Sequence, residues 1–309
     1  MARRSASLRA EIARWGLRWF VKKRSHHQTI EQARATFHSI EWLIPYPPRG
    51  TVTEPITVGD GATADLITTP ASGHDRFVLY LHGGAYRLGS PATFRNFTWR
   101  IATAARARVV ALDYRLAPEH PFPAALEDAL SAYRWLLSEI APPKLALLGD
   151  SAGGGLALGL LLKLRDVGLP LPSVAVALSP WTDLALSGAS ITANAQADPM
   201  LNADDLPQFA AEYLRGADPG SPYASPLYGD PAGLPPTLFQ VGSDEIMRDD
   251  TLRMAEKMID AGCKVVVEVW PRMPHVWHLL APMVPEARAA IKKVGAFIDE
   301  RLATHSSNE

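Results

Sequence analysis

The sequence predicts an α/β protein whose open, mostly parallel sheet is covered by helices on both faces. Short apolar runs alternate with longer helix-like segments from Thr51 to Leu302. The later runs are apolar throughout, as is typical of strands buried on both faces of a parallel sheet. The first two runs have no helix between them and can form an antiparallel edge. These observations together define the class.

Each expected strand is a short run rich in Val, Leu, Ile or aromatic residues, and each expected helix is a longer run with apolar residues three or four positions apart. We expect strands, in chain order, at Thr51–Val58, Ala64–Thr69, Phe77–Leu81, Val109–Tyr114, Leu145–Leu148, Val174–Leu178, Thr237–Val241 and Val265–Val269. We expect helices at Thr93–Ala107, Ala124–Ile140, Ala152–Asp166, Asp250–Ala261 and Pro285–Leu302.

Two regions stand outside this alternation. The first 44 residues read as helical, with Leu8, Ile12, Trp15 and Trp19 on one face and Arg and Lys over much of the remainder. We expect the apolar face to be buried. The second region is the connection of almost sixty residues between the strands ending at Leu178 and starting at Thr237, which predicts a lid or binding element.

Composition excludes several classes of protein. The chain has 309 residues, with 31 Lys and Arg against 32 Asp and Glu, so no basic excess favours nucleic-acid binding. Its single cysteine, Cys263, can form neither an intramolecular disulfide nor a multi-cysteine metal site. No apolar stretch approaches the roughly 18 residues of a membrane span. We therefore expect a cytoplasmic protein without a nucleic-acid partner.

The strongest local motif is the G-x-S-x-G of Gly149, Ser151 and Gly153, which follows an expected strand and opens an expected helix. A serine on such a sharp turn is exposed, and the helix N-terminus behind it stabilises negative charge. The same pattern also fits an ordinary tight turn with a capping serine, but the strand–turn–helix context favours a nucleophile.

A second motif, His82-Gly83-Gly84, ends another expected strand. Adjacent glycines let backbone N–H groups approach a substrate closely. The N–H groups of Gly83, Gly84 and Ala152 would form an oxyanion hole. Taken alone, the motif also fits a glycine-rich loop without chemistry.

A nucleophilic serine needs a base and an orienting acid, which follow it in the order acid and then histidine. His275 lies past a strand end and is the expected base, with His278 as a helix-start or lid residue. Asp244 is the first carboxylate after the Thr237–Val241 strand and is the expected acid, with the longer Glu245 as its substitute. We expect Asp249 and Asp250 to be helix caps. Trp181 is the best candidate for a pocket residue.

The sequence resembles the hormone-sensitive-lipase family of bacterial esterases and lipases, a capped branch of the α/β hydrolases. The resemblance spans about Phe77 to Leu302 and rests on five segments: His82-Gly83-Gly84, Asp113–Ala125, Gly149–Gly154, Asp244–Asp249 (similar to Asp-Pro-Leu-x-Asp) and Met273-Pro274-His275. It implies Ser151 as nucleophile, His275 as base and Asp244 as orienter. It also implies metal-free hydrolysis, with no cofactor, of short- to medium-chain acyl esters.

The family's architecture gives the expected domains: N-terminal helices contributing to the cap in 1–44, a catalytic domain in 45–184 and 227–309, and a cap insertion in 185–226. We expect residues 1–44 to pack with Ala185–Pro226 beside Ser151, rather than to anchor the protein to a membrane. Peripheral membrane contact through residues 1–24 is the alternative. The edge strand Val265–Val269 is a candidate for pairing with a second copy.

Other functions remain open at this point. A lactone or amide hydrolase would use the same groups, and a small-ligand receptor can occupy a hydrolase scaffold. Such receptors lose the histidine, which is present here as His275.

Overall fold

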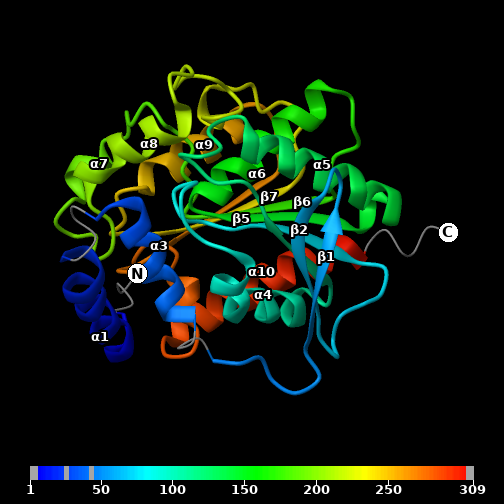
Figure 1. Cartoon of the computed structure of the whole chain (residues 1–309), viewed down its shortest axis with the longest axis horizontal. Coiled ribbons are helices and arrows are strands. Elements are labelled where there is room, and N and C mark those ends of the chain that lie inside the picture. The colour runs from blue at the N-terminus through cyan, green and yellow to red at the C-terminus, as the bar shows by residue number, and fades with distance from the viewer. Residues whose placement is uncertain (1–5, 24–27, 42–44, 304–309) are drawn as a thin grey trace.

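The computed structural model describes residues 6–23, 28–41 and 45–303, which fold around an eight-stranded sheet (Figure 1). The strands lie in the order β1-β2-β4-β3-β5-β6-β7-β8. Their bounds are β1 Val52–Val58, β2 Ala62–Thr68, β3 Phe77–Leu81, β4 Arg108–Asp113, β5 Leu145–Asp150, β6 Val174–Leu178, β7 Thr237–Gly242 and β8 Val265–Trp270. The predicted α/β class is confirmed.

The first two strands form the antiparallel edge that the sequence predicts, since β1 pairs antiparallel with β2, and β2 with β4. All remaining neighbours are parallel. In this register, Leu81 on β3 is paired with Gly149 on β5, and Asp150 with Leu178 on β6. The loops after these strands therefore emerge at one edge of the sheet, the usual place for a site in such folds.

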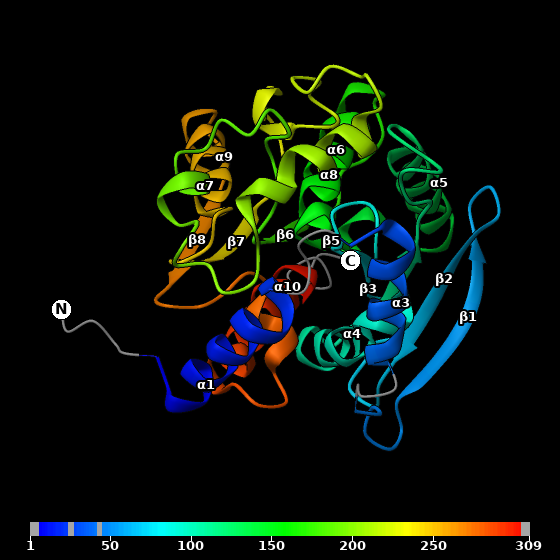
Figure 2. The same ribbon diagram turned by 60° about the vertical axis from the view of Figure 1, so that its left-hand side comes forward.

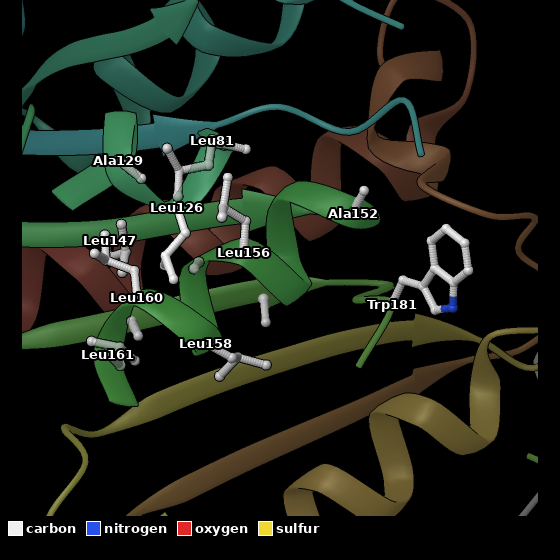
Figure 3. Packing of buried hydrophobic residues seen from close by; sticks show 14 of the residues in the cluster. Leu81, Leu126, Ala129, Leu147, Ala152, Leu156, Leu158, Leu160, Leu161 and Trp181 are labelled. Carbon is white, nitrogen blue, oxygen red and sulfur yellow. The ribbon is translucent and has the colours of Figure 1, made fainter. Parts of the chain in front are cut away.

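Helices cover both faces of the sheet (Figure 1). One face carries α4 (Pro91–Ala105) and α10 (Pro285–Ala303), and the other carries α5 (Ala124–Glu139), α6 (Ala152–Asp166) and α9 (Arg248–Asp260). Figure 3 shows the leucines of α6 packed between the sheet and α5. Each such buried leucine stabilises the fold by roughly 1.5–3 kcal/mol.

The predicted insertion contains only short elements. These are α7 (Ser190–Ala193), the 3₁₀ turn η3 (Ala203–Asp205), α8 (Leu206–Leu214) and the 3₁₀ turn η4 (Pro226–Tyr228). The ring of Tyr213 on α8 stacks on Tyr86 with centroids 3.7 Å apart. Tyr86 lies two residues after Gly84, so the insertion is packed against the loop that follows β3.

The N-terminal region forms α1 (Leu8–Leu17), the π-helical η1 (Arg18–Lys22) and α3 (Ile30–Glu41). Figure 2 shows α1 next to α10, and α3 over α4. The prediction that Leu8, Ile12, Trp15 and Trp19 form the buried face is wrong. Leu8, Ile12 and Trp15 are 77%, 60% and 61% exposed, and the buried residues of α1 are Ala10, Ala13 and Arg14.

The reason for this reversal is the polarity of the surface that receives the helix. Arg18 donates to the carbonyl of Gln196 at 2.8 Å, and Lys22 donates to those of Ala195 and Asp198 at 2.6 and 2.8 Å. Loop carbonyls need hydrogen-bond donors, and Arg and Lys side chains supply several donors each, whereas an indole supplies one. The basic face of the helix therefore turns inward.

In the part of the chain that the structure describes, no helix is both long and apolar enough to cross a membrane. β8 is the edge strand of the sheet, with Val266 and Val269 exposed. Pairing of this strand with a second copy stays a prediction.

Candidate active site

Ser151 occupies a strained turn between β5 and α6, with φ 52° and ψ −123°. The close approach of neighbouring backbone explains the two glycines of the motif. A Cβ on Gly149 would lie 2.1 Å from the carbonyl oxygen of Gly153, and one on Gly153 would lie 2.1 Å from that of Leu81. Such strain persists only where the surroundings enforce it, and it is concentrated at functional sites.

The base predicted from the sequence lies against this serine. Nε2 of His275 is 2.8 Å from Oγ of Ser151, and the imidazole is 4% exposed. His275 belongs to the loop after β8, and Val276 beside it adopts φ 45°. The two residues are 124 positions apart in the sequence and lie at the distance that a nucleophile–base pair in acyl transfer requires.

The predicted acid is corrected by the structure. The carboxylate that contacts His275 is Glu245, whose Oε2 lies 2.8 Å from Nδ1. Its other oxygen accepts hydrogen bonds from the Gly242 N–H at 2.5 Å and the Ser179 hydroxyl at 2.8 Å. With both oxygens held, Glu245 can orient the imidazole, and Asp244 does not take this place.

Asp244 points the other way, toward the N-terminal helix. Its Oδ2 is 2.8 Å from Nη2 of Arg14, and its Oδ1 accepts from the Ser243 hydroxyl at 2.7 Å. A signal for Glu245 was present in the sequence. The motif Asp-Pro-Leu-x-Asp separates its two acids by four positions, which fits Glu245 and Asp249, whereas Asp244 and Asp249 are five apart.

Burial and hydrogen bonding act against each other on this pair. Burial raises the pKa of Glu245, and the hydrogen bonds from His275, Gly242 and Ser179 oppose that rise. Burial by itself would lower the pKa of His275, but the hydrogen bond and charge of Glu245 raise it above 6.5. The carboxylate thus makes the imidazole a stronger base.

The predicted oxyanion hole also needs one correction. The N–H of Gly83 donates to Oδ1 of Asp150 at 3.1 Å, so it is already engaged. Among the described residues, the N–H groups of Gly84, Ala85 and Ala152 have no hydrogen-bond acceptor. Ala152 is the first residue of α6, where such groups are left free by helix geometry. Two of these free N–H donors therefore lie in the loop after β3, and the third belongs to the residue directly after Ser151.

Asp150 anchors that loop from beneath. Its carboxylate is buried and accepts from the Tyr80 hydroxyl at 2.5 Å as well as from Gly83. Burial raises the pKa of Asp150 to about 6, against the lowering effect of the Tyr80 hydrogen bond. The residue before the nucleophile thus fixes the position of the glycine loop.

Two further predicted residues have defined surroundings. Trp181 is buried, its backbone N–H donates to the Ser151 carbonyl at 2.9 Å, and Figure 3 shows its side chain near Ala152. Its role in substrate binding stays a prediction. His278 begins a 3₁₀ turn with Trp277, and its Nε2 lies 2.7 Å from Oε1 of Gln240, away from the serine.

No group of three or more His, Cys, Asp or Glu side chains suited to a metal ion is found among the described residues. The side chains and backbone donors of the site lie at the carboxyl ends of β3, β5, β7 and β8. Such an arrangement, on a strained strand–turn–helix serine, is that of an α/β-hydrolase acyl-transfer site.

Comparison with known proteins agrees with this class. Residues 78–279 match a family model described as "alpha/beta hydrolase fold". An acetyl-hydrolase of Streptomyces hygroscopicus is 50% identical over 244 residues, covering 79% of this chain and 81% of the relative. An esterase of Acinetobacter venetianus is 36% identical over 239 residues, covering 77% and 78%.

Solved structures extend the likeness to nearly the whole chain. A bacterial esterase of the hormone-sensitive lipase family matches with a TM-score of 0.92 and 41% identity, covering 97% of this chain and 100% of that one. EstE5, soaked with p-nitrophenyl butyrate, matches with a TM-score of 0.92 and 40% identity, covering 96% and 100%. The chain belongs to the α/β-hydrolase family, in its branch of bacterial hormone-sensitive-lipase esterases, and is an ester hydrolase.

Proposed function

We propose that the protein is a serine carboxylesterase that hydrolyses short- to medium-chain acyl esters through a Ser151–His275–Glu245 triad and an acyl-enzyme intermediate. The observation that carries this proposal is the continuous hydrogen-bonded line from the Ser151 hydroxyl through both nitrogens of His275 to Glu245, with two distances of 2.8 Å. This hydrogen-bonded line supports the roles of nucleophile, base and orienting acid for the three residues.

In the first half-reaction, Oγ of Ser151 attacks the ester carbonyl while Nε2 of His275 takes the hydroxyl proton. Glu245 accepts the Nδ1–H and stabilises the imidazolium that forms. His275 then gives its proton to the departing alkoxide, and the acyl group remains on Ser151. In the second half-reaction, water takes the place of the serine hydroxyl and releases the carboxylic acid.

The tetrahedral intermediate carries a negative oxygen that needs donors. We assign these to the N–H groups of Gly84, Ala85 and Ala152, because the Gly83 N–H is held by Asp150. Loss of one such donor in other enzymes slows turnover by roughly 10²–10³-fold. The N-terminus of α6 adds its dipole to the same oxygen.

We further propose that residues 1–44 and 185–226 together form the cap and one wall of the acyl pocket. Arg18 and Lys22 hold the carbonyls of residues 195–198, and Arg34 of α3 is paired with Glu119 at 2.6 and 2.7 Å. The likeness to a relative named acetyl-hydrolase supports a preference for short acyl chains. Lactone or amide hydrolysis would use the same groups.

The test combines a covalent probe with a substrate series. An organophosphonate with a p-nitrophenoxy leaving group is expected to form a P–O bond to Oγ of Ser151 with release of p-nitrophenol, so the protein gains the mass of the reagent less that of p-nitrophenol. Ser151→Ala is expected to lower ester turnover by several orders of magnitude without unfolding the protein. Initial rates on p-nitrophenyl esters from acetate to palmitate should peak at short chains. An adduct on another serine, or near-normal turnover in Ser151→Ala, would refute the mechanism.

A further inference from the structure

Arg14 is a nearly buried cation on a helix whose other large side chains mostly face solvent. Arg14 is 8% exposed. It nevertheless lies outside the apolar face of α1, which is the face that the sequence predicts to be buried. Removing a guanidinium from water is costly unless every part of it is paired. Its partners therefore indicate what the buried charge achieves.

Three separate segments supply those partners. Nη1 donates to the carbonyl of Arg272 at 2.7 Å, and Nη2 is paired with Oδ2 of Asp244 at 2.8 Å. Nη2 also contacts the carbonyl of Ala197 at 3.4 Å. One planar side chain thus joins the histidine loop, the acid loop and the cap insertion. Figure 2 shows α1 beside the orange segment that carries the histidine loop.

The two loops that Arg14 joins each carry one member of the triad. Asp244 directly precedes Glu245, and Arg272 lies three positions before His275. A second link closes the arrangement, because the Arg272 N–H donates to the Ser243 hydroxyl at 2.8 Å, and that hydroxyl donates to Asp244. Arg14 completes this ring from outside without touching a triad residue.

The neighbouring residue on the helix reinforces the same loop. Glu11 forms a two-bonded ion pair with the Arg272 guanidinium at 2.6 and 2.9 Å. Arg18, one turn further along, donates to the cap carbonyls of Gln196 and Ala197 at 2.8 and 3.3 Å, and it has no hydrogen bond to either triad loop among the described residues. The contacts between α1 and the two triad loops are therefore made by Arg14 and Glu11.

We propose that Arg14 is a positioning residue that holds the acid and histidine loops at the spacing required for the Glu245–His275 hydrogen bond. The inference rests on the proposed function, since it assigns to the cap helix a part in ordering that triad. In this proposal α1 contributes to catalysis by ordering two of the triad residues, in addition to forming part of the cap.

The kinetic test compares Arg14→Gln with Arg14→Lys and with Arg9→Gln, since Arg9 is a solvent-exposed arginine of the same helix. Arg14→Gln is expected to lower kcat on p-nitrophenyl acetate at least about tenfold, with KM changed less than about twofold, because misplaced groups slow the chemical step. The kcat of Arg14→Lys should lie between those of Arg14→Gln and the wild type, since an ammonium keeps the charge but not the planar fork. Arg9→Gln, the matched control, should lose less than about twofold in kcat. Equal kcat in Arg14→Gln and Arg9→Gln, or a change confined to KM, would overturn the proposal.

A coupling test uses Arg14→Lys, so it remains usable if Arg14→Gln folds poorly. Asp244→Asn removes the ion pair with Asp244 but leaves the contacts of Arg14 with Arg272, Ala197 and Glu11, so we expect a loss of a few-fold in kcat. The double variant of Arg14→Lys and Asp244→Asn should be little worse than Arg14→Lys alone if both act through one contact. Losses in kcat that are fully additive would contradict a shared contact of Arg14 and Asp244.

The third readout does not depend on turnover. The Nδ1 proton of His275, bonded to a carboxylate, should give a low-field proton NMR signal that is absent in His275→Ala. We expect that signal to be weakened or lost in folded Arg14→Gln and retained in Arg9→Gln. An unchanged signal would refute the positioning role. Ester turnover that survives in Ser151→Ala would instead refute the proposed function, and the NMR comparison would still decide the role of Arg14.

Discussion

At the scale of single residues, the site depends on which of two adjacent carboxylates faces the histidine. Ser151 and His275 follow from their motifs and from chain order. The acid does not, because Asp244 and Glu245 both follow β7 and differ by one side-chain carbon. Backbone direction decides between them: Glu245 turns inward to Ser179 and Gly242, while Asp244 turns outward to Arg14.

The pH dependence of turnover follows from the same contacts. The base must be neutral to accept the serine proton, and Glu245 raises the pKa of His275 above 6.5. As pH falls through that raised pKa, the imidazole becomes protonated and turnover is lost. We therefore predict that the acid limb of kcat/KM lies above about pH 6.5 when measured from about pH 5 to about pH 9.

A control separates His275 from the buried Asp150, whose pKa is raised to about 6. The Tyr80 hydroxyl lowers the pKa of Asp150, so Tyr80→Phe should raise it further. If His275 governs the limb, its midpoint will stay in place in Tyr80→Phe. An upward move of the midpoint would identify Asp150 as the titrating group.

At the scale of elements, side-chain contacts hold the helices to the loops. The alternation of strand-like and helix-like runs in the sequence cannot reveal these contacts. Asp249 and Asp250 were predicted to be helix caps, but α9 begins at Arg248 and both carboxylates bind backbone N–H groups of other segments. Asp250 is buried and accepts from the N–H groups of Thr182 and Asp183 at 2.8 and 2.9 Å. It therefore joins α9 to the loop that carries Trp181.

We predict that Asp250→Ala costs more than the removal of a helix cap. Two buried N–H groups would lose their acceptor, which gives an expected loss of about 2–4 kcal/mol in the free energy of unfolding. A lost cap typically costs about 1 kcal/mol. Urea denaturation of the variant and the wild type measures the difference, and a loss below about 1 kcal/mol would contradict this account of the contact.

The same limit explains the reversed face of α1. Helical periodicity correctly groups Leu8, Ile12 and Trp15 on one side, but it cannot show the surface that the helix meets. That surface is made of carbonyls and the Asp244 carboxylate, so it accepts Arg14 and leaves the indole of Trp15 in solvent. Helical periodicity shows which residues share a face, and the surface that the helix packs against determines which face is buried.

At the scale of the whole molecule, the fold was predictable because it rests on repeated local patterns. Buried strands read as apolar runs, and the loops after β3 and β5 carry glycine motifs that neighbouring strands bring to one edge. The association of the N-terminal helices with the insertion depends on contacts between residues about 180 positions apart, such as Lys22 with Ala195. These contacts leave no periodic signal.

We predict that deleting residues 1–22 lowers ester turnover at least about tenfold, or shifts the preferred acyl length, while the sheet domain still unfolds cooperatively. The deletion removes Arg14, the Glu11–Arg272 pair and the contacts of Lys22. Kinetics on the ester series and thermal unfolding measure the two effects. Unchanged kinetics together with lost binding to anionic liposomes would favour a membrane-contact role for this helix instead.

The measurement that tests the central claim most directly is kcat/KM on p-nitrophenyl acetate for Glu245→Gln against Asp244→Asn. In Glu245→Gln the amide can turn an N–H donor toward Nδ1, and this favours the wrong imidazole tautomer. We therefore predict a loss of about 10³–10⁴-fold. Asp244→Asn should lose less than about tenfold, because Asp244 contacts Arg14 rather than His275. A severe loss in Asp244→Asn with an active Glu245→Gln would contradict the triad described here.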